Sequence, residues 1–338
     1  MARMSERAIL PQRITVLSGG VGGARFLQGL QRLIQRTAAT TEVTVIANTG
    51  DDIWMHGLKV CPDLDTVMYT LGDGIDTDRG WGRKGETWHA KEELAAYGVQ
   101  PDWFGLGDRD LATHLVRTQM LDAGYSLTDV TNALCRRWQP RVTLLPMTDD
   151  RVETHVVITD PDDGQDKAAH FQEYWIKHQA AVPAKAVVMI GADQAKPTQA
   201  VLNAISETDL ILLPPSNPVV SVGAILAVPG IRDALRATQA PIVGISGIIN
   251  GDHVRGMARQ LLEVISVECS AAGVAEHYGA RSRGGLLDAW LIDDSDSDTV
   301  GRISSAGIAC QAVPLWMTDP DATADMCQTA IDLAHRNA

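Results

Sequence analysis

Long hydrophobic runs are missing from this sequence of 338 residues, and so is an apolar segment near its beginning. No stretch approaches the roughly twenty uninterrupted apolar residues that a transmembrane helix requires. The opening MARMSERAILPQR also lacks the apolar core of a secretory signal. We therefore expect a protein that is neither exported nor anchored to a membrane, and we place it in the cytoplasm.

Cysteine is scarce and scattered. The sequence has five cysteines, an odd number with no CxxC pair: Cys61, Cys135, Cys269, Cys310 and Cys327. This pattern excludes a disulfide framework and fits a reducing compartment. We expect free thiols that are mostly buried.

Positive charge is in short supply as well. Lys and Arg number 29 against 42 Asp and Glu, which gives a formal net charge of -13. Nucleic-acid surfaces need an excess of Lys and Arg, so this balance excludes nucleic acid as the expected partner. A small anionic ligand would have to be held locally, by backbone N–H groups, a few basic side chains or a metal ion.

Short apolar runs alternate with amphipathic segments of helix length, and 45% of the residues are hydrophobic. This rhythm predicts an α/β fold of the doubly wound, Rossmann-like type, with a mainly parallel sheet and helices on both faces. We predict one α/β domain over 12–338, with a mostly helical insert over 63–139 that caps the switch point. Two acidic stretches, 160–166 and 293–298, are expected to be solvated loops. The predicted strands are Ile14–Leu17, Val43–Ala47, Val142–Leu145, Val152–Ile158, Val187–Ile190, Leu210–Leu213, Ile242–Ile245 and Leu287–Ile292.

A glycine-rich loop, SGGVGGAR, follows the first predicted strand. Glycine lets the backbone turn sharply and approach a phosphate closely, where N–H groups at a helix N-terminus bind the anion. No Gly-Lys-Ser/Thr follows, so this is not a Walker loop, and Arg25 replaces the third glycine of a dinucleotide fingerprint. The second strand ends in Asn48 rather than in a ribose-binding acid. We favour phosphate binding over a tight turn without ligand, and the residues concerned are Gly19, Gly20, Gly22, Gly23 and Arg25.

Four short carboxylates follow the second strand: Asp51, Asp52, Asp63 and Asp65. Carboxylates on loops hold Mg²⁺ together with substrate phosphates. Asp63 and Asp65 could equally cap a helix that begins near Thr66. A magnesium site and simple capping therefore both remain open from these residues alone.

Three further motifs each allow two interpretations, a role in ligand binding and a purely structural role. Arg109 and Thr113, four residues apart on a predicted helix, share a face, although a surface ion pair explains Arg109 as well. Ser216 and Asn217 in the rigid PPSNP loop can bond a base, ribose or phosphate, or simply stiffen the loop. The stretch HFQEYWI at 170–176 could stack a flat ring or pack in the core. No Ser-His-Asp or Cys-His order surrounds an elbow motif, so covalent catalysis has no support.

Together these stretches resemble one family, the phospholactate transferases of deazaflavin-coenzyme biosynthesis, called CofD in archaea and FbiA in mycobacteria. The resemblance covers most of the chain, from residue 18 to residue 280. Its matching stretches are SGGVGGAR, ANTGDD, PDLDTVMYTLGD, WGRKGET, LGDRDLATH, SLTDVT, LPMTDDRVET, HFQEYWI, PPSNPVVSVGAIL and GVAEHYGA.

The resemblance implies transfer of a phospholactyl or phosphoenolpyruvyl group from a guanosine-diphosphate-linked donor. The acceptor is the terminal ribityl hydroxyl of Fo, a deazariboflavin, and GMP is released. The resemblance also implies a requirement for Mg²⁺ and a homodimer. The mycobacterial members are associated with the enolpyruvyl donor and the archaeal ones with the lactyl donor.

Carried over to this sequence, the resemblance implies a role for each candidate. The expected catalytic residues are Asp65, Asp51 and Arg109, and one of the two aspartates could be the general base. The expected Mg²⁺ ligands are Asp51, Asp63 and Asp65. The expected substrate-binding residues are Gly19, Gly20, Gly22, Gly23, Arg25, Asn48, Thr113, Ser216 and Asn217.

Two other classes of function stay open at this point. A related branch of the superfamily consists of nucleotide-sugar-binding regulators that share the glycine loop and the Asp-Asp pair but catalyse no transfer. A nicotinamide dehydrogenase is disfavoured by the broken fingerprint and the absent ribose-binding acid.

Overall fold

Runs of buried apolar residues form the central sheet of the computed structural model, which describes residues 10–254 and 257–337. All seven strands pair in parallel, in the order β14-β13-β10-β9-β1-β2-β5. A parallel sheet is covered by helices on both faces, as this one is. The predicted doubly wound fold is therefore confirmed. The strands are β1 (Arg13–Ser18), β2 (Glu42–Ala47), β5 (Thr143–Pro146), β9 (Leu210–Leu213), β10 (Ile242–Ile245), β13 (Ala289–Ile292) and β14 (Ala309–Ala312).

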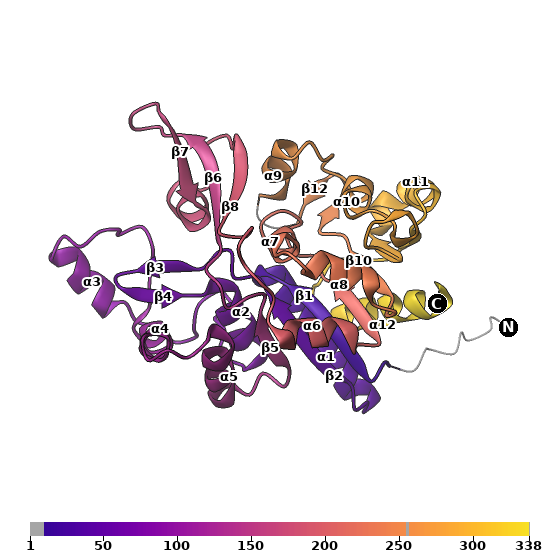
Figure 1. Cartoon of the computed structure of the whole chain (residues 1–338), viewed down its shortest axis with the longest axis horizontal. Coiled ribbons are helices and arrows are strands. Elements are labelled where there is room, and N and C mark those ends of the chain that lie inside the picture. Colours follow the sequence, from indigo (N-terminus) through magenta and orange to yellow (C-terminus); the bar gives the residue numbers. More distant parts are fainter. Residues whose placement is uncertain (1–9, 255–256, 338) are drawn as a thin grey trace.

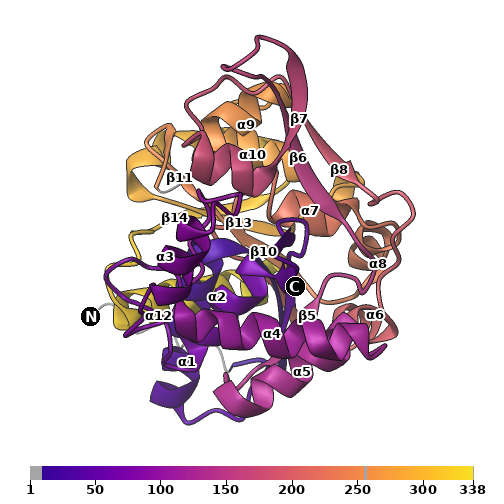
Figure 2. The same ribbon diagram turned by 90° about the vertical axis from the view of Figure 1, so that its left-hand side faces the viewer.

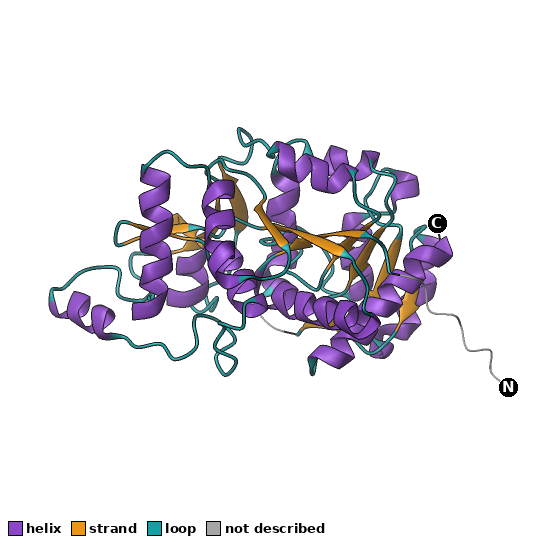
Figure 3. Cartoon of the chain, turned by 90° about the horizontal axis from the view of Figure 1, so that it is seen from below, coloured by secondary structure: helices purple, strands orange, loops and turns teal. Residues whose placement is uncertain are grey.

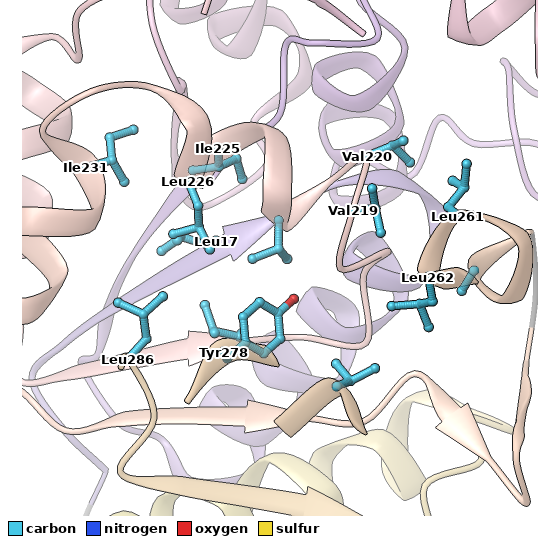
Figure 4. Packing of buried hydrophobic residues seen from close by; sticks show 14 of the residues in the cluster. Leu17, Val219, Val220, Ile225, Leu226, Ile231, Leu261, Leu262, Tyr278 and Leu286 are labelled. Atoms are coloured by element: carbon cyan, nitrogen blue, oxygen red, sulfur yellow. The ribbon is translucent and has the colours of Figure 1, made fainter. Parts of the chain in front are cut away.

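Helices cover both faces of this sheet (Figure 3). One face is packed by α1 (Gly20–Thr37), α2 (Pro62–Leu71), α5 (Leu127–Trp138) and α12 (Pro320–Asn337). The other face is packed by α6 (Gln199–Ser206), α7 (Val222–Ala227), α8 (Ile231–Ala237), α9 (Ala258–Val264), α10 (Ala271–Tyr278) and α11 (Val300–Ser305). Figure 4 shows part of this second layer, where Leu17, Ile225 and Tyr278 pack together with their neighbours. Among the described residues, no helix combines the length and the apolar character that crossing a membrane needs.

The order of the strands reverses between β1 and β9. From β1 the chain proceeds to β2 and β5 on one side, then returns to β9 on the other side of β1. Ligands of open α/β sheets bind outside the carboxyl ends of the strands at such a switch point. The loops that follow β1, β2 and β9 are therefore the ones that frame the site.

Two predicted strands lie outside the central sheet. β6 (Glu153–Thr159) is the central strand of a separate sheet of order β7-β6-β8, in which it pairs antiparallel with β7 (Asp166–His170) on one side and with β8 (Ala186–Ile190) on the other. Assigning them to the parallel sheet was wrong, because β6 buries only every second residue, as a strand with one covered face does. β7 and β14 were not among the predicted strands.

The first acidic stretch is the solvated loop that we expected: residues 161–166 are exposed, and only Asp166 already belongs to β7. The second stretch differs from the expectation. In the second stretch Asp293 and Asp296 are buried. Asp293 accepts a hydrogen bond from the backbone N–H of Leu315, and Asp296 accepts one from Asn250. Both carboxylates thus satisfy backbone donors that would otherwise be buried without partners.

Between β2 and β5 the chain forms a hairpin and four helices (Figures 1 and 2). The hairpin consists of β3 (Ile53–Met55) and β4 (Leu58–Val60), and α3 (His89–Ala96) and α4 (Asp108–Asp122) complete the stretch with α2 and α5. α2 packs on α1 and α5 packs on β5, while α4 contacts β4 and α5. α2 and α5 thus belong to the helical layer of the sheet, and α3, α4 and the hairpin lie outside it.

Close packing of α12 on α1 yields a test of this architecture. Gly29 of α1 is buried, and a Cβ there would overlap the side chain of Thr323 in α12. Gly29→Ala should therefore lower the melting temperature, although alanine is a better helix former than glycine by about 1 kcal/mol. Gly301→Ala in α11, where a Cβ meets nothing within 4 Å, should raise it slightly. Thermal unfolding of the two variants checks this, and equal behaviour would contradict the packing.

Candidate functional site

The glycine loop meets the loop after β9 at the switch point. α1 begins at Gly20, and its N-cap residue Gly19 has no side chain to cap the first turn. The hydroxyl of Ser216 accepts a hydrogen bond from the N–H of Gly19 at 3.2 Å and donates one to its carbonyl at 2.8 Å. This hydroxyl ties the two loops together, and the N–H of Gly20 bonds the buried carboxylate of Asp63. The N-terminal end of a helix is suited to binding an anion, and here a carboxylate already lies against it.

The glycines of this loop are also required by the protein itself. A Cβ at Gly22 would lie 2.6 Å from the carbonyl oxygen of Pro215, and one at Gly23 would overlap the Ser18 hydroxyl. A Cβ at Gly19 would lie 2.7 Å from a carboxylate oxygen of Asp63. Gly20 has a φ of 64°, in the left-handed region that favours glycine. Close packing therefore accounts for Gly19, Gly22 and Gly23, and the backbone conformation accounts for Gly20, without any ligand.

Asn48 organises the turn after β2. Its side-chain oxygen accepts from the N–H of Gly50 at 2.8 Å, and its amide nitrogen donates to Asp63 at 2.9 Å. Burial and the neighbouring Asp63 raise the pKa of Asp51 well above its usual range, against the effect of Asn48. Burial also raises the pKa of Asp63, to about 6. The two buried carboxylates thus form a like-charge pair beside the glycine loop.

The three predicted metal ligands do not converge. Asp51 and Asp63 lie on either side of the Asn48 side chain. Asp65 lies two residues after Asp63 on α2 and forms an ion pair with Arg117 of α4. Over the part of the chain that the structure describes, no group of three or more His, Cys, Asp or Glu side chains has a metal-binding arrangement. The Oδ1 atom of Asp51 is buried and has no hydrogen-bond partner among these residues.

Other predicted site residues are more dispersed. Arg109 is exposed on α4, where its N–H donates to Glu86 and its carbonyl accepts from Arg83, while Thr113 is buried. Arg25 is exposed on α1. The side chain of Asn217 accepts from the N–H groups of Val219 and Val220, at 2.9 and 3.1 Å. Asn217 therefore stiffens its own loop in the first place.

A pocket of about 450 Å³, its open mouth included, lies beside the Pro214–Pro218 loop. Its lining combines apolar side chains with polar groups, which come from Ser216, Asn217, His253, Tyr278, Trp290 and backbone atoms. The lining residues are Leu213, Pro214, Pro215, Ser216, Asn217, Pro218, Ile245, Gly247, Ile248, His253, Ala258, Val274, Tyr278 and Trp290. The pocket shares Pro215 and Ser216 with the walls of the glycine loop, so a ligand could span both.

This chain is similar to known proteins in sequence and in fold. Residues 14–314 match the family model described as 2-phospho-L-lactate transferase CofD. The chain belongs to the CofD family. Proteins named phosphoenolpyruvate transferase are similar to it: that of Nocardia farcinica is 60% identical over 95% of both chains. The protein of Streptomyces coelicolor is 62% identical and that of Mycobacterium avium 58% identical, each over 95% of this chain and 98% of the relative.

Among solved structures, a member of the UPF0052 family from Bacillus halodurans is similar in fold. Its TM-score is 0.59 at 20% sequence identity, over 94% of this chain and 99% of that one. At this identity the likeness concerns the fold alone.

Sequence reasoning missed several buried polar residues of this CofD-family chain. Arg117 pairs with Asp65, and His114 lies against both. Lys59 lies 3.2 Å from Asp52, whose carbonyl also receives a hydrogen-bond contact of 3.1 Å from His170. The only available signal for Arg117 was its spacing of i+4 from Thr113 and i+3 from His114 within one helix.

The like-charge pair yields a stability prediction. The folded-state pKa values of Asp51 and Asp63 lie above the unfolded value near 4. Their contribution to the free energy of unfolding is therefore fully present at low pH and is lost as the pH rises through the folded pKa. Asp51→Asn keeps the shape and removes the repulsion. In metal-free buffer it should raise the melting temperature by about 2 °C or more at pH 8 and by less at pH 4.5.

Calorimetry at the two pH values measures this difference. The exposed Asp122 provides the control, because Asp122→Asn should change neither value. A lower melting temperature of Asp51→Asn at pH 8 would contradict the like-charge pair.

Proposed function

We propose that this protein transfers a phosphoenolpyruvyl group from enolpyruvyl-diphosphoguanosine to the terminal ribityl hydroxyl of Fo and releases GMP. The observation that carries the proposal is identity of about 60% over 95% of the chain with relatives named phosphoenolpyruvate transferase. Their name favours the enolpyruvyl over the lactyl donor. The acceptor and the guanosine diphosphate part come from the family resemblance. Cytoplasmic location and a homodimer stay predictions.

The glycine loop supports a site for the donor diphosphate. The N-cap residue of α1, Gly19, has no side chain, the first turn contains no acidic residue, and the exposed Arg25 lies one turn further along the helix. Backbone N–H groups and a nearby guanidinium neutralise phosphate charge without taking part in covalent chemistry. We assign the guanosine to the pocket beyond Pro215, next to Ser216.

The Asp51–Asp63 pair fits a role as Mg²⁺ ligands. Two buried carboxylates of like charge, one with an unpartnered oxygen, are suited to a hard cation that keeps water and substrate phosphates as its other ligands. Magnesium, when bound, would neutralise charge that develops on the phosphate oxygens. Asp65 is not needed in this set, since Arg117 already neutralises it.

Asp65 is then the group that we assign to the acceptor. Its Oδ2 atom is buried and has no hydrogen-bond partner among the described residues. It would accept a hydrogen bond from the ribityl hydroxyl and take up its proton as the hydroxyl oxygen attacks the phosphorus of the enolpyruvyl phosphate. The new P–O bond replaces the bridging P–O bond, and GMP leaves with the bridging oxygen.

Turnover of purified protein tests the proposed function. With Fo, the enolpyruvyl donor and Mg²⁺, chromatography should show the dehydro coupled product and an equal amount of GMP. Excess EDTA should abolish the product, and Mg²⁺ in excess of EDTA should restore it. Binding of GDP without any product would favour the nucleotide-binding regulator, and full activity in EDTA would overturn the role of the metal.

Gly247 provides a test of the guanosine pocket. A Cβ there meets only ordinary contacts, 3.6 Å from Pro215, so a longer side chain can enter the pocket without distorting the backbone. Gly247→Met should raise the dissociation constant of GDP about tenfold or more, a loss of about 1.4 kcal/mol. Titration calorimetry measures it, with Gly301→Met as the matched exposed control. Unchanged GDP affinity would move the guanosine out of this pocket.

A further inference from the structure

A buried polar network joins α2 to α4 behind Asp65, and the proposed reaction uses none of its other members. Asp65 and Tyr69 come from α2, and Asp110, His114 and Arg117 come from α4. His114 and Arg117 are each 1% exposed, which is unusual for such polar side chains. Burying them costs free energy unless their polar atoms are paired, so the arrangement of the pairs is informative.

Arg117 makes the contacts that orient Asp65. One terminal nitrogen of its guanidinium pairs with Oδ1 of Asp65. The other donates to the carbonyl of Lys59 at 3.3 Å and to Nδ1 of His114 at 3.0 Å. A guanidinium only donates, so Nδ1 of His114 is the acceptor and the imidazole proton lies on Nε2.

The far end of the network fixes His114. Its Nε2 lies 3.4 Å from Oδ2 of Asp110, an ion-pair distance without a hydrogen bond, and the hydroxyl of Tyr69 donates to Oδ1 of the same aspartate at 2.6 Å. Each member therefore lies against the next, from Tyr69 to Asp110, His114, Arg117 and Asp65.

This arrangement leaves one oxygen of Asp65 for a donor from outside the network. Oδ2 lies 3.8 Å from Nδ1 of His114, but that nitrogen is already an acceptor and has no proton to donate. Among the described residues Oδ2 has no hydrogen-bond partner, although it is buried. Buried carboxylate oxygens normally have a partner, so an external donor such as a hydroxyl would complete the set.

We propose that Arg117, held by His114 and Asp110, is a positioning residue that fixes the Asp65 carboxylate and directs its Oδ2 toward the acceptor hydroxyl. The proposal rests on the proposed function, because it assigns the acceptor to Asp65. Arg117 itself contacts no substrate in this scheme. Its effect on the reaction must therefore pass through Asp65.

A double-mutant cycle tests this dependence. Asp65→Asn, Arg117→Met and the double variant are compared by kcat, by KM for donor and acceptor, and by melting temperature. Each single variant should lower kcat by roughly two orders of magnitude and change KM for the donor little. The double variant should be no slower than Asp65→Asn alone, because the arginine has nothing left to position.

Arg117→Lys supplies the conservative variant. It keeps the charge but loses the second donor arm to His114, so its kcat should lie between those of the wild type and Arg117→Met. If Arg117→Met does not fold, the cycle is run with Arg117→Lys and the same expectation of non-additivity.

Arg281 provides a matched structural control. It donates to the carbonyls of Leu235 and Ala240 before the amino end of β10 and pairs with Asp288 at 3.2 Å. Arg281→Met should lower the melting temperature but leave kcat of the folded enzyme unchanged.

Two outcomes overturn the positioning role while leaving the proposed function in place. One is a double variant whose loss in kcat equals the product of the single losses, and the other is an Arg117→Met that behaves like Arg281→Met. A wild-type protein that forms no coupled product overturns the proposed function and the positioning role together.

Discussion

Parallel pairing of β1 with β2 on one side and with β9 on the other is the constraint on which the rest of the site depends. It brings three loops that are far apart in the sequence to one edge of the sheet. The Ser216 hydroxyl then binds both backbone groups of Gly19, and Asn48 links the β2 turn to Asp63 at the start of α2. The glycine loop, the Asp51–Asp63 pair and the pocket beside Pro214–Pro218 are thus positioned by strand pairing before any side chain contributes chemistry.

Much of this edge could be predicted from the sequence, because each strand end carries its own local signal. Glycines after β1, an amide and two aspartates after β2, and the proline-flanked Ser-Asn after β9 are recognisable without knowledge of their neighbours. The α/β rhythm predicts a parallel sheet, but the order of its strands was not predicted. Six of the seven central strands were located to within a residue or two, and β14 was not predicted.

What could not be predicted depends on contacts between distant elements. α4 carries Arg109, Thr113 and Arg117 on successive turns. Only the packing of α4 against β4 decides that Arg117 is buried and Arg109 exposed. The same holds for the aspartates: Asp63 and Asp65 are two residues apart on α2, so they point to different neighbours. β6 and β8 were misplaced because their apolar runs do not reveal whether the partner strand is parallel or antiparallel.

The contact between α12 and α1 joins the last helix of the chain to the first. During synthesis α1 emerges early, yet its contact with α12 forms only after residues 320–337 have left the ribosome. At typical rates of about 5–20 residues per second this delay lasts tens of seconds. The helix that follows the glycine loop therefore lacks one of its packing partners until the end of synthesis, so this part of the core is completed last.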